Sequence, residues 1–280
     1  RREFAPDRPS PRFRPAGDAT AGTPGASVCG CSETDDEDMI DTLFHLFLWG
    51  HILAGAIGLV TFWVPIATRK GGRDHVRGGR IFARCMIVTG TFALGISICT
   101  LLDPLGTHPH MEDAALVRGI FGWMMLYLAV LTINLAWYGL LCIRNRRDHA
   151  ANGEWRNRIL QYLVMALAVN TAIQGWRIDQ VLMMGISIVG VAAGITNLRF
   201  IHRSPSRIGW QLEHVKGLVG AGISVYTAFL AFGAVRLLPA AALSPVLWSV
   251  PLITGLGIIF WYWYRIIAQD RARSAGGAAA

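Results

Sequence analysis

The sequence predicts an all-α, polytopic integral membrane protein: a bundle of seven transmembrane helices with the N-terminus outside and the C-terminus in the cytoplasm. Three observations support this prediction. The 280-residue chain is 53% hydrophobic and only 16% charged, whereas soluble domains carry about 25% charged residues. The apolar residues form long charge-free blocks, each near the ~18–20 residues that a helix needs to cross a bilayer. Lys and Arg are gathered in short patches between these blocks.

Three regions follow one another along the chain. Residues 1–38 are rich in Arg, Pro, Gly and Ser and end in an acidic run, so we expect a disordered tail. Met39 directly precedes the first apolar block, and we interpret it as the natural start, with the upstream residues not native. Residues 39–267 are expected to form the seven-helix membrane domain, and residues 268–280 a second disordered tail.

Seven charge-free windows define the expected spans. Arg84, at the start of the second span, can extend its side chain back to the interface. The last window contains three prolines, so its helix should begin near Ser244, with Pro251 kinking or interrupting it. The windows are Thr42–Thr68, Cys85–Leu102, Gly119–Ile143, Ile159–Trp176, Gln180–Leu198, Gly217–Val235 and Leu237–Tyr264.

Loop charges predict the orientation. The first, third and fifth loops and the C-terminal tail contain several basic residues each. The loops between them contain one basic residue each: Arg118, Arg177 and Arg236. By the positive-inside rule the basic loops are cytoplasmic. We therefore expect a multi-pass protein of the bacterial inner (cytoplasmic) membrane, surrounded by the lipid bilayer. Because the basic residues are accounted for by topology, no nucleic-acid partner is expected.

A group of polar residues is predicted at the cytoplasmic boundary. His75, Arg77 and Arg80 precede the second span, and His214 opens the sixth. Two histidines at equal depth on different helices are what bis-imidazole haem ligation requires. With the two arginines they can equally hold an anionic head group, a phosphate or a quinone oxygen. The alternative, that the arginines are only topogenic and the histidines only interfacial, stays open.

A second polar group is expected inside the membrane. His51 lies in the first span, Asn170 and Gln174 share one face of the fourth, and Tyr226 and Thr227 lie in the sixth. Their depths allow them to meet in the outer half of the bundle. Ionisable residues within a membrane are functional candidates, and such a patch is typical of a transport path. The alternative is that His51 only forms a hydrogen bond between helices.

Other motifs indicate no established chemistry. His108 and His110 lie near acidic residues in an outer loop, and Cys29 and Cys31 form a C-x-C in the tail. The C-x-C lacks a second pair of ligands, and an H-x-H with nearby acids can bind a metal but is more often only a polar loop. No metal site is therefore predicted. The metalloprotease, serine-hydrolase, P-loop and dinucleotide-binding motifs are absent from the sequence.

Several segments together carry a family resemblance. They are His51-Ile-Leu-Ala-Gly55, His75-Val-Arg77-Gly-Gly79-Arg80-Ile-Phe82, and the helix from His214 to Thr227-Ala228-Phe229. This combination resembles an uncharacterised bacterial family of predicted multi-helix membrane proteins, defined only by a domain of unknown function. The chain departs from the family pattern at Val76, where Arg is usual, and at Phe82, where Tyr is usual. The resemblance implies a shared fold and a shared inner site, but no activity.

Three hypotheses for function result. The first is a cofactor site for b-type haem or quinone redox chemistry, with His75 and His214 as ligands and the two arginines pairing with anionic groups. The second is a small-molecule or proton-coupled transporter whose path passes His51 and the amides of the fourth span. The third is a non-catalytic sensor or assembly subunit that binds another membrane protein. No catalytic residue is assigned.

Overall fold

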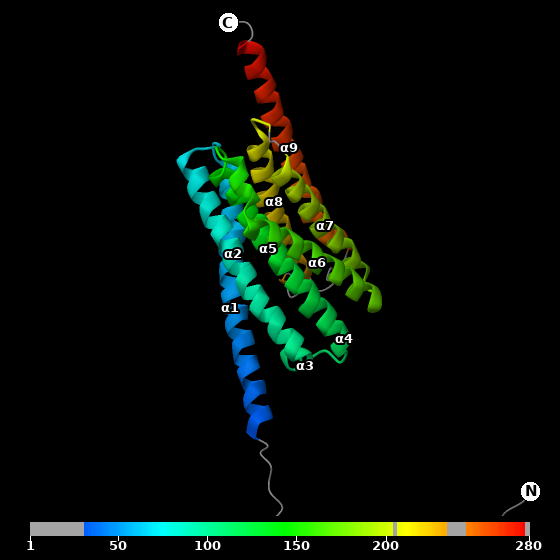
Figure 1. Cartoon of the computed structure of the whole chain (residues 1–280). Coiled ribbons are helices and arrows are strands. Elements are labelled where there is room, and N and C mark those ends of the chain that lie inside the picture. Colours follow the sequence, from blue (N-terminus) through cyan, green and yellow to red (C-terminus); the bar gives the residue numbers. More distant parts are fainter. Residues whose placement is uncertain (1–30, 204–205, 234–244, 278–280) are drawn as a thin grey trace, which may run out of the picture.

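The structure is an all-α bundle (Figure 1). The computed structural model describes residues 31–203, 206–233 and 245–277. In this part of the chain there are helices and no strands. Seven of the helical segments are long and apolar enough to cross a membrane, which confirms the predicted seven-span fold. Large apolar side chains on their outer faces, such as Val60, Trp176 and Ile253, are exposed, and the bilayer is the environment that accommodates them.

The helices follow the charge-free windows closely. The third span combines α4, a π-helical segment and α5, and the sixth ends in a π-helical turn. Short α3 and a 3₁₀ turn lie in the connections. The bounds are α1 Cys31–Ala67, α2 Arg73–Leu102, α3 Pro104–Thr107, α4 Ala114–Val117, η1 Arg118–Met124, α5 Met125–Arg144, η2 His149–Gly153, α6 Trp155–Arg177, α7 Val181–His202, α8 Gly209–Ala228, η3 Phe229–Gly233 and α9 Pro245–Gly277.

The first and last helices are longer than the sequence suggested. α1 begins at Cys31, so the expectation of a tail without structure is wrong for residues 31–38. The acidic sequence there favours a helix N-terminus. α9 continues to Gly277, which corrects the expected C-terminal tail, because Ala and Arg are good helix formers. The rest of the predicted N-terminal tail lies outside the described residues. Pro251 lies within α9, which begins at Pro245, close to the expected start.

The third span is the centre of the bundle. Its most apolar window is 72% buried, whereas no other span exceeds 39%. α5 is apolar on nearly all sides, as a helix surrounded by other helices must be. It packs against α2, α6 and α8, while α1 packs mainly on α2 and α7 on α6. The chain therefore forms two outer helix pairs on opposite sides of α5 (Figure 1).

Two glycines allow α5 and α8 to touch. A Cβ atom at Gly217 of α8 would lie 2.8 Å from the Cα atom of Gly139 in α5. Real Cβ atoms essentially never come so close to backbone. Only glycine at this crossing permits the observed separation, as in small-residue contacts between membrane helices.

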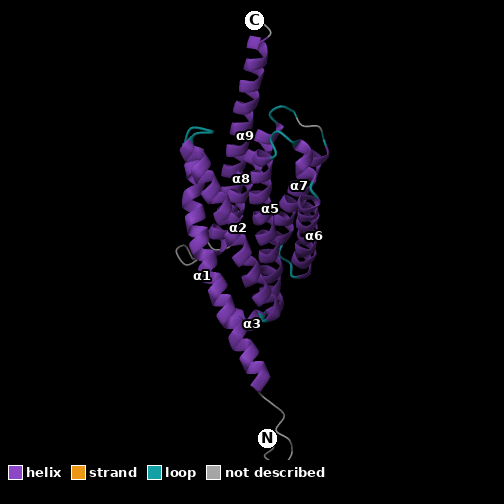
Figure 2. Ribbon diagram, turned by 60° about the vertical axis from the view of Figure 1, so that its left-hand side comes forward, coloured by secondary structure: helices purple, strands orange, loops and turns teal. Residues whose placement is uncertain are grey.

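The two ends of the bundle differ in charge. The described termini lie at opposite ends (Figure 2), as an odd number of spans requires. The end with the α1–α2 turn, the α5–α6 connection and the start of α8 holds most of the basic residues. We call this the basic end; the positive-inside rule predicts that it faces the cytoplasm.

Candidate functional site

A cavity of about 500 Å³ opens at the basic end of the bundle. Both His75 at the start of α2 and His214 at the start of α8 line it. The rest of the wall is mostly apolar and includes Trp137 and Leu140 of α5 and Leu218 of α8. The structure thus brings the two histidines of the predicted inner site into one pocket.

His75 is positioned by the turn between α1 and α2. Gly78 lets α2 lie directly against α1, since a Cβ atom there would approach Val64 to 2.6 Å. This contact brings the Nδ1 atom of His75 to 3.0 Å from the carbonyl oxygen of Pro65. Lys70 also donates to this carbonyl and to that of Ile66, so the end of α1 is fixed by side chains from the turn.

His214 is positioned by the close contact between α5 and α8. Its Nδ1 atom lies 2.9 Å from the carbonyl oxygen of Gly139. Gly139 has no side chain to cover that carbonyl, and Gly217, one turn after His214, lies against the Cα and nitrogen atoms of Gly139. The glycine crossing therefore also places the imidazole.

These two hydrogen bonds fix the tautomers of the rings. A carbonyl oxygen can only accept, so Nδ1 must carry the hydrogen in both His75 and His214. In the neutral rings the Nε2 atoms then hold free lone pairs. No described residue forms a hydrogen bond to either Nε2 atom. Metal-binding histidines usually have this arrangement, with the second ring nitrogen donating to a backbone carbonyl or carboxylate.

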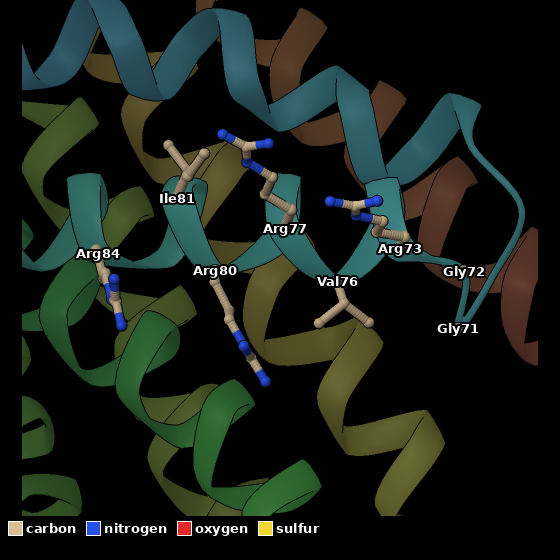
Figure 3. Close-up of a pocket in the computed structure, with 8 residues that line it drawn as sticks. All are labelled: Gly71, Gly72, Arg73, Val76, Arg77, Arg80, Ile81 and Arg84. Carbon is tan, nitrogen blue, oxygen red and sulfur yellow. The ribbon is translucent and has the colours of Figure 1, made fainter.

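Three arginines surround the cavity. Arg80 and Arg84 of α2 and Arg144 of α5 line it, and none forms an ion pair with a described acidic residue. Arg77 does not line it, which corrects the prediction that Arg77 belongs to this site. Two residues after His75, Arg77 is rotated by about 200° around the helix. Arg80 lies only about 60° around α2 from Arg77, but the two side chains extend in different directions (Figure 3).

The predicted polar patch in the outer half of the bundle is not formed. His51 of α1 lies 3.1 Å, through Nδ1, from the carbonyl oxygen of Thr89 in α2. Asn170 and Gln174 belong to α6, which packs on α7 and α5 on the other side of the bundle (Figure 1). Hydropathy gave their depth but not their neighbours. The structure therefore does not bring these residues together, although their depths would have allowed it.

Tyr226 and Thr227, the remaining members of that patch, lie near the end of α8. The hydroxyl of Tyr226 donates to the carbonyl of Leu59 at 2.8 Å and accepts from the indole of Trp63 at 2.7 Å. This aromatic contact joins α8 to α1. It forms no path toward α6 among the residues that the structure describes.

Sequence reasoning missed a buried amide cluster between α5, α6 and α7. Gln161 exchanges two hydrogen bonds with Asn134, of 3.0 and 2.7 Å, donates to Asn157 and accepts from Asn197. Gln161, Asn134 and Asn197 are completely buried. Amides within predicted spans were the available signal, because such side chains pair between membrane helices.

An ion pair between Glu213 and Lys216 of α8 lies next to His214 in the sequence. Glu213 accepts a hydrogen bond of 2.6 Å from the hydroxyl of Tyr138 and pairs with Lys216 one turn along α8. Tyr138 is fully buried. These contacts add a polar link between α5 and α8 beside the glycine crossing, and they hold the start of α8 in register with the end of α5.

The outer loop with His108 and His110 is packed through aromatic rings. His108 lies 4.4 Å, between ring centroids, from Phe121, and 5.8 Å from Phe44. Among the described residues no group of three or more His, Cys, Asp or Glu side chains is placed to hold a metal. Burial lowers the pKa of His108, and the neighbouring His110 lowers this pKa further.

Acidification is therefore expected to loosen this loop. The folded pKa of His108 lies below its unfolded value, so the neutral ring stabilises the fold above the unfolded pKa, and this contribution is lost as the pH falls below it. Thermal unfolding followed from about pH 8 to about pH 5 should show a smaller loss for His108→Gln than for the unmodified protein. Equal losses in the two proteins would contradict this assignment.

The fold and its apolar spans define a multi-pass membrane protein. No protein-family model, curated protein or solved structure matches the chain. The family resemblance of the His75 and His214 segments therefore stays a prediction, and function must be argued from the cavity itself.

Proposed function

We propose that the cavity at the basic end binds a redox cofactor, b-type haem, with the Nε2 atoms of His75 and His214 as its axial ligands. One observation carries the proposal. Two imidazoles from different helices line the same apolar cavity, and each has its Nδ1–H directed to a backbone carbonyl. This leaves one ligand lone pair on each ring, as bis-histidine ligation requires.

The other cavity residues fit the same group. Apolar walls exclude water from a macrocycle, and the carbonyls that accept from Nδ1 increase the basicity of both ligands. The guanidinium groups of Arg80, Arg84 and Arg144 form no ion pair with an acid that the structure describes. They can form charge-assisted hydrogen bonds with carboxylates, which a haem carries as propionates. When bound, haem supplies one-electron transfer. We place the protein in the inner membrane of a bacterium, with the basic end in the cytoplasm, on the basis of loop charge and the resemblance above.

The proposal predicts a haem absorption spectrum for the purified protein. Protein produced under haem-replete conditions should show a Soret band and split visible bands on reduction. His75→Ala and His214→Ala should each abolish bis-histidine ligation, because each removes one axial nitrogen. His202→Ala is the matched control: this exposed ring donates only within its own helix, to the carbonyl of Leu198, and its loss should leave the spectrum unchanged.

Two outcomes contradict the haem proposal. The first is protein that is colourless and gains no band when haemin is added. The second is a spectrum that persists in both histidine variants. A quinone is the second candidate for the same cavity, because the arginines can donate to quinone oxygens. Colourless protein that retains a quinone on purification, and loses it in His75→Ala but not in His202→Ala, would favour that candidate.

A further inference from the structure

We propose that the first turns of α2 bind an anionic phospholipid, with its phosphate held by Arg73 and Arg77. The depression that carries this site adjoins the cofactor cavity and shares Val76, Arg80 and Arg84 with it. Neither Arg73 nor Arg77 lines the cavity, so the phosphate site does not depend on what the cavity binds. The surface depression that carries it is lined at its head by Gly71 and Gly72, and it includes Ile81 one turn beyond Arg77.

The positive charge at the start of α2 is not balanced by nearby acids. The twelve residues 73–84 contain four arginines and a single acid, Asp74. In the part of the chain that the structure describes, none of these guanidinium groups forms a hydrogen bond or an ion pair, and Asp74 pairs with none of them. Like charges three or four residues apart on a helix repel each other. A bound anion would relieve that repulsion.

The arginine side chains at the start of α2 do not all extend in the same direction. Arg73, Arg77 and Ile81 follow one another along α2, whereas the side chains of Arg80 and Arg84, about 60° around the helix from Arg77 and Ile81, extend in another direction (Figure 3). The first three residues are spaced by four, so they form a row along the helix, here called the lipid row. Arg73 and Arg77 are both exposed. The guanidinium groups of the lipid row are thus free to bind a ligand that the cavity does not hold.

The chemistry of the lipid row matches a phospholipid. Guanidinium groups bind phosphate through paired hydrogen bonds. Gly71, with φ of +75°, makes the turn that precedes α2 without a side chain over the depression. Ile81 and the exposed Val88 continue the same side of the helix toward the membrane centre. A head group at the arginines therefore places its acyl chains against apolar residues.

The position of the lipid row at the membrane boundary favours a lipid over a soluble anion. A soluble phosphate would need only the arginines, whereas the row leads from the end of the bundle directly into an apolar span. Anionic lipids attract arginines at this boundary. We therefore infer a lipid and not a soluble anion.

Native mass spectrometry or lipid-dependent thermal stabilisation of the full chain tests the site. The probes are phosphatidylglycerol, phosphatidylcholine and inorganic phosphate, added to protein in neutral detergent. We expect preferential binding of phosphatidylglycerol, weakened about 30-fold in the double variant Arg73→Gln/Arg77→Gln, as estimated from the contribution of two arginines near an anionic surface. The control Arg271→Gln/Arg273→Gln removes the same charge from the exposed end of α9 and should retain the preference.

Each alternative result overturns the proposal. Equal weakening in the two double variants would show that only net charge matters. Equal binding of both lipids would show that there is no anion site. If inorganic phosphate protects as well as phosphatidylglycerol, and Ile81→Asn changes neither, the ligand is a soluble anion. A size-exclusion profile unchanged from the parent protein, expected because both arginines are exposed, verifies that the variants are folded.

Discussion

Gly217→Ala is expected to lower the free energy of unfolding by about 3 kcal/mol, the upper part of the usual range for overpacking. The added Cβ atom would lie 2.8 Å from the Cα atom of Gly139, and 2.9 Å from both its nitrogen and the carbonyl oxygen of Leu135. All three are backbone atoms of α5, so no side chain can move aside. The two helices must therefore separate. Because α5 is the most buried span of the bundle, this separation disturbs its packing.

The same change should also disturb the cavity. Separation of α5 from α8 draws the ring of His214 away from the carbonyl of Gly139, to which its Nδ1 donates at 2.9 Å. We therefore expect Gly217→Ala to lower the thermal midpoint and to weaken any ligand of the cavity together. Both can be measured on one sample by thermal unfolding and absorption.

Gly257→Ala provides the matched control. Gly257 also lies within a membrane helix, and nothing lies within 4 Å of a Cβ atom built there. Alanine is the better helix former by about 1 kcal/mol, so this variant should be as stable as the parent or slightly more stable. If Gly217→Ala behaves like Gly257→Ala, then α5 and α8 do not cross at these glycines.

The sequence was informative about depth along the membrane normal. Charge-free windows measure the hydrocarbon thickness directly, so the seven spans were predicted correctly. Equal depth is also why His75 and His214 could be considered together, since α2 and α8 both begin at the basic end. The basic loops that precede α2 and α8 can be recognised in the sequence without any knowledge of how the helices pack.

Neighbours around the bundle could not be predicted in the same way. The depths of His51 and Asn170 allowed them to meet, but α1 and α6 lie on opposite sides of α5 (Figure 2). Apolar residues occur on all sides of a membrane helix, because lipid and neighbouring helices are equally apolar. A hydrophobic pattern therefore does not tell which face meets protein. Arg77 was misassigned for a related reason, since its direction around α2 was not considered.

Glycines and amides within the spans mark which helices are in contact. Gly139 and Gly217 mark the α5–α8 contact, and Gln161 with Asn134 marks the α5–α6 contact. Each residue is plain in the sequence, but pairing them requires knowing which helices are adjacent. The inner site was predicted in part because both histidines precede or open a span. The amide cluster was missed because Asn134, Gln161 and Asn197 lie within spans, where hydropathy does not show which helices are neighbours.

Gln161→Leu is expected to destabilise the bundle by about 2–4 kcal/mol, because it leaves several buried polar groups without partners. The side chain of Gln161 is completely buried and forms hydrogen bonds with Asn134, Asn157 and Asn197. A leucine fills a similar volume, so the cost comes from the unpaired amides and not from a cavity. Unfolding in detergent at increasing denaturant concentration should show an earlier midpoint.

A double-mutant cycle separates pairing from packing. Removing both partners of a buried hydrogen bond costs less than removing one, so Asn134→Leu/Gln161→Leu should be less destabilised than the sum of the single variants. Gln174→Leu is the control on the same helix, since its half-buried amide forms no hydrogen bond with any residue that the structure describes. An additive cycle, or equal costs for Gln161→Leu and Gln174→Leu, would show that the amide cluster does not hold α5 to α6.

The amide cluster and the cavity should also respond independently. Gln161 and its partners link α5 to α6 and α7, whereas the cavity is lined by α1, α2, α5 and α8. Gln161→Leu should therefore lower stability and leave the spectrum or affinity of a cavity ligand unchanged below the unfolding transition. Gly217→Ala should change both. If the two variants affect the cavity equally, its geometry depends on the whole bundle and not on the α5–α8 crossing.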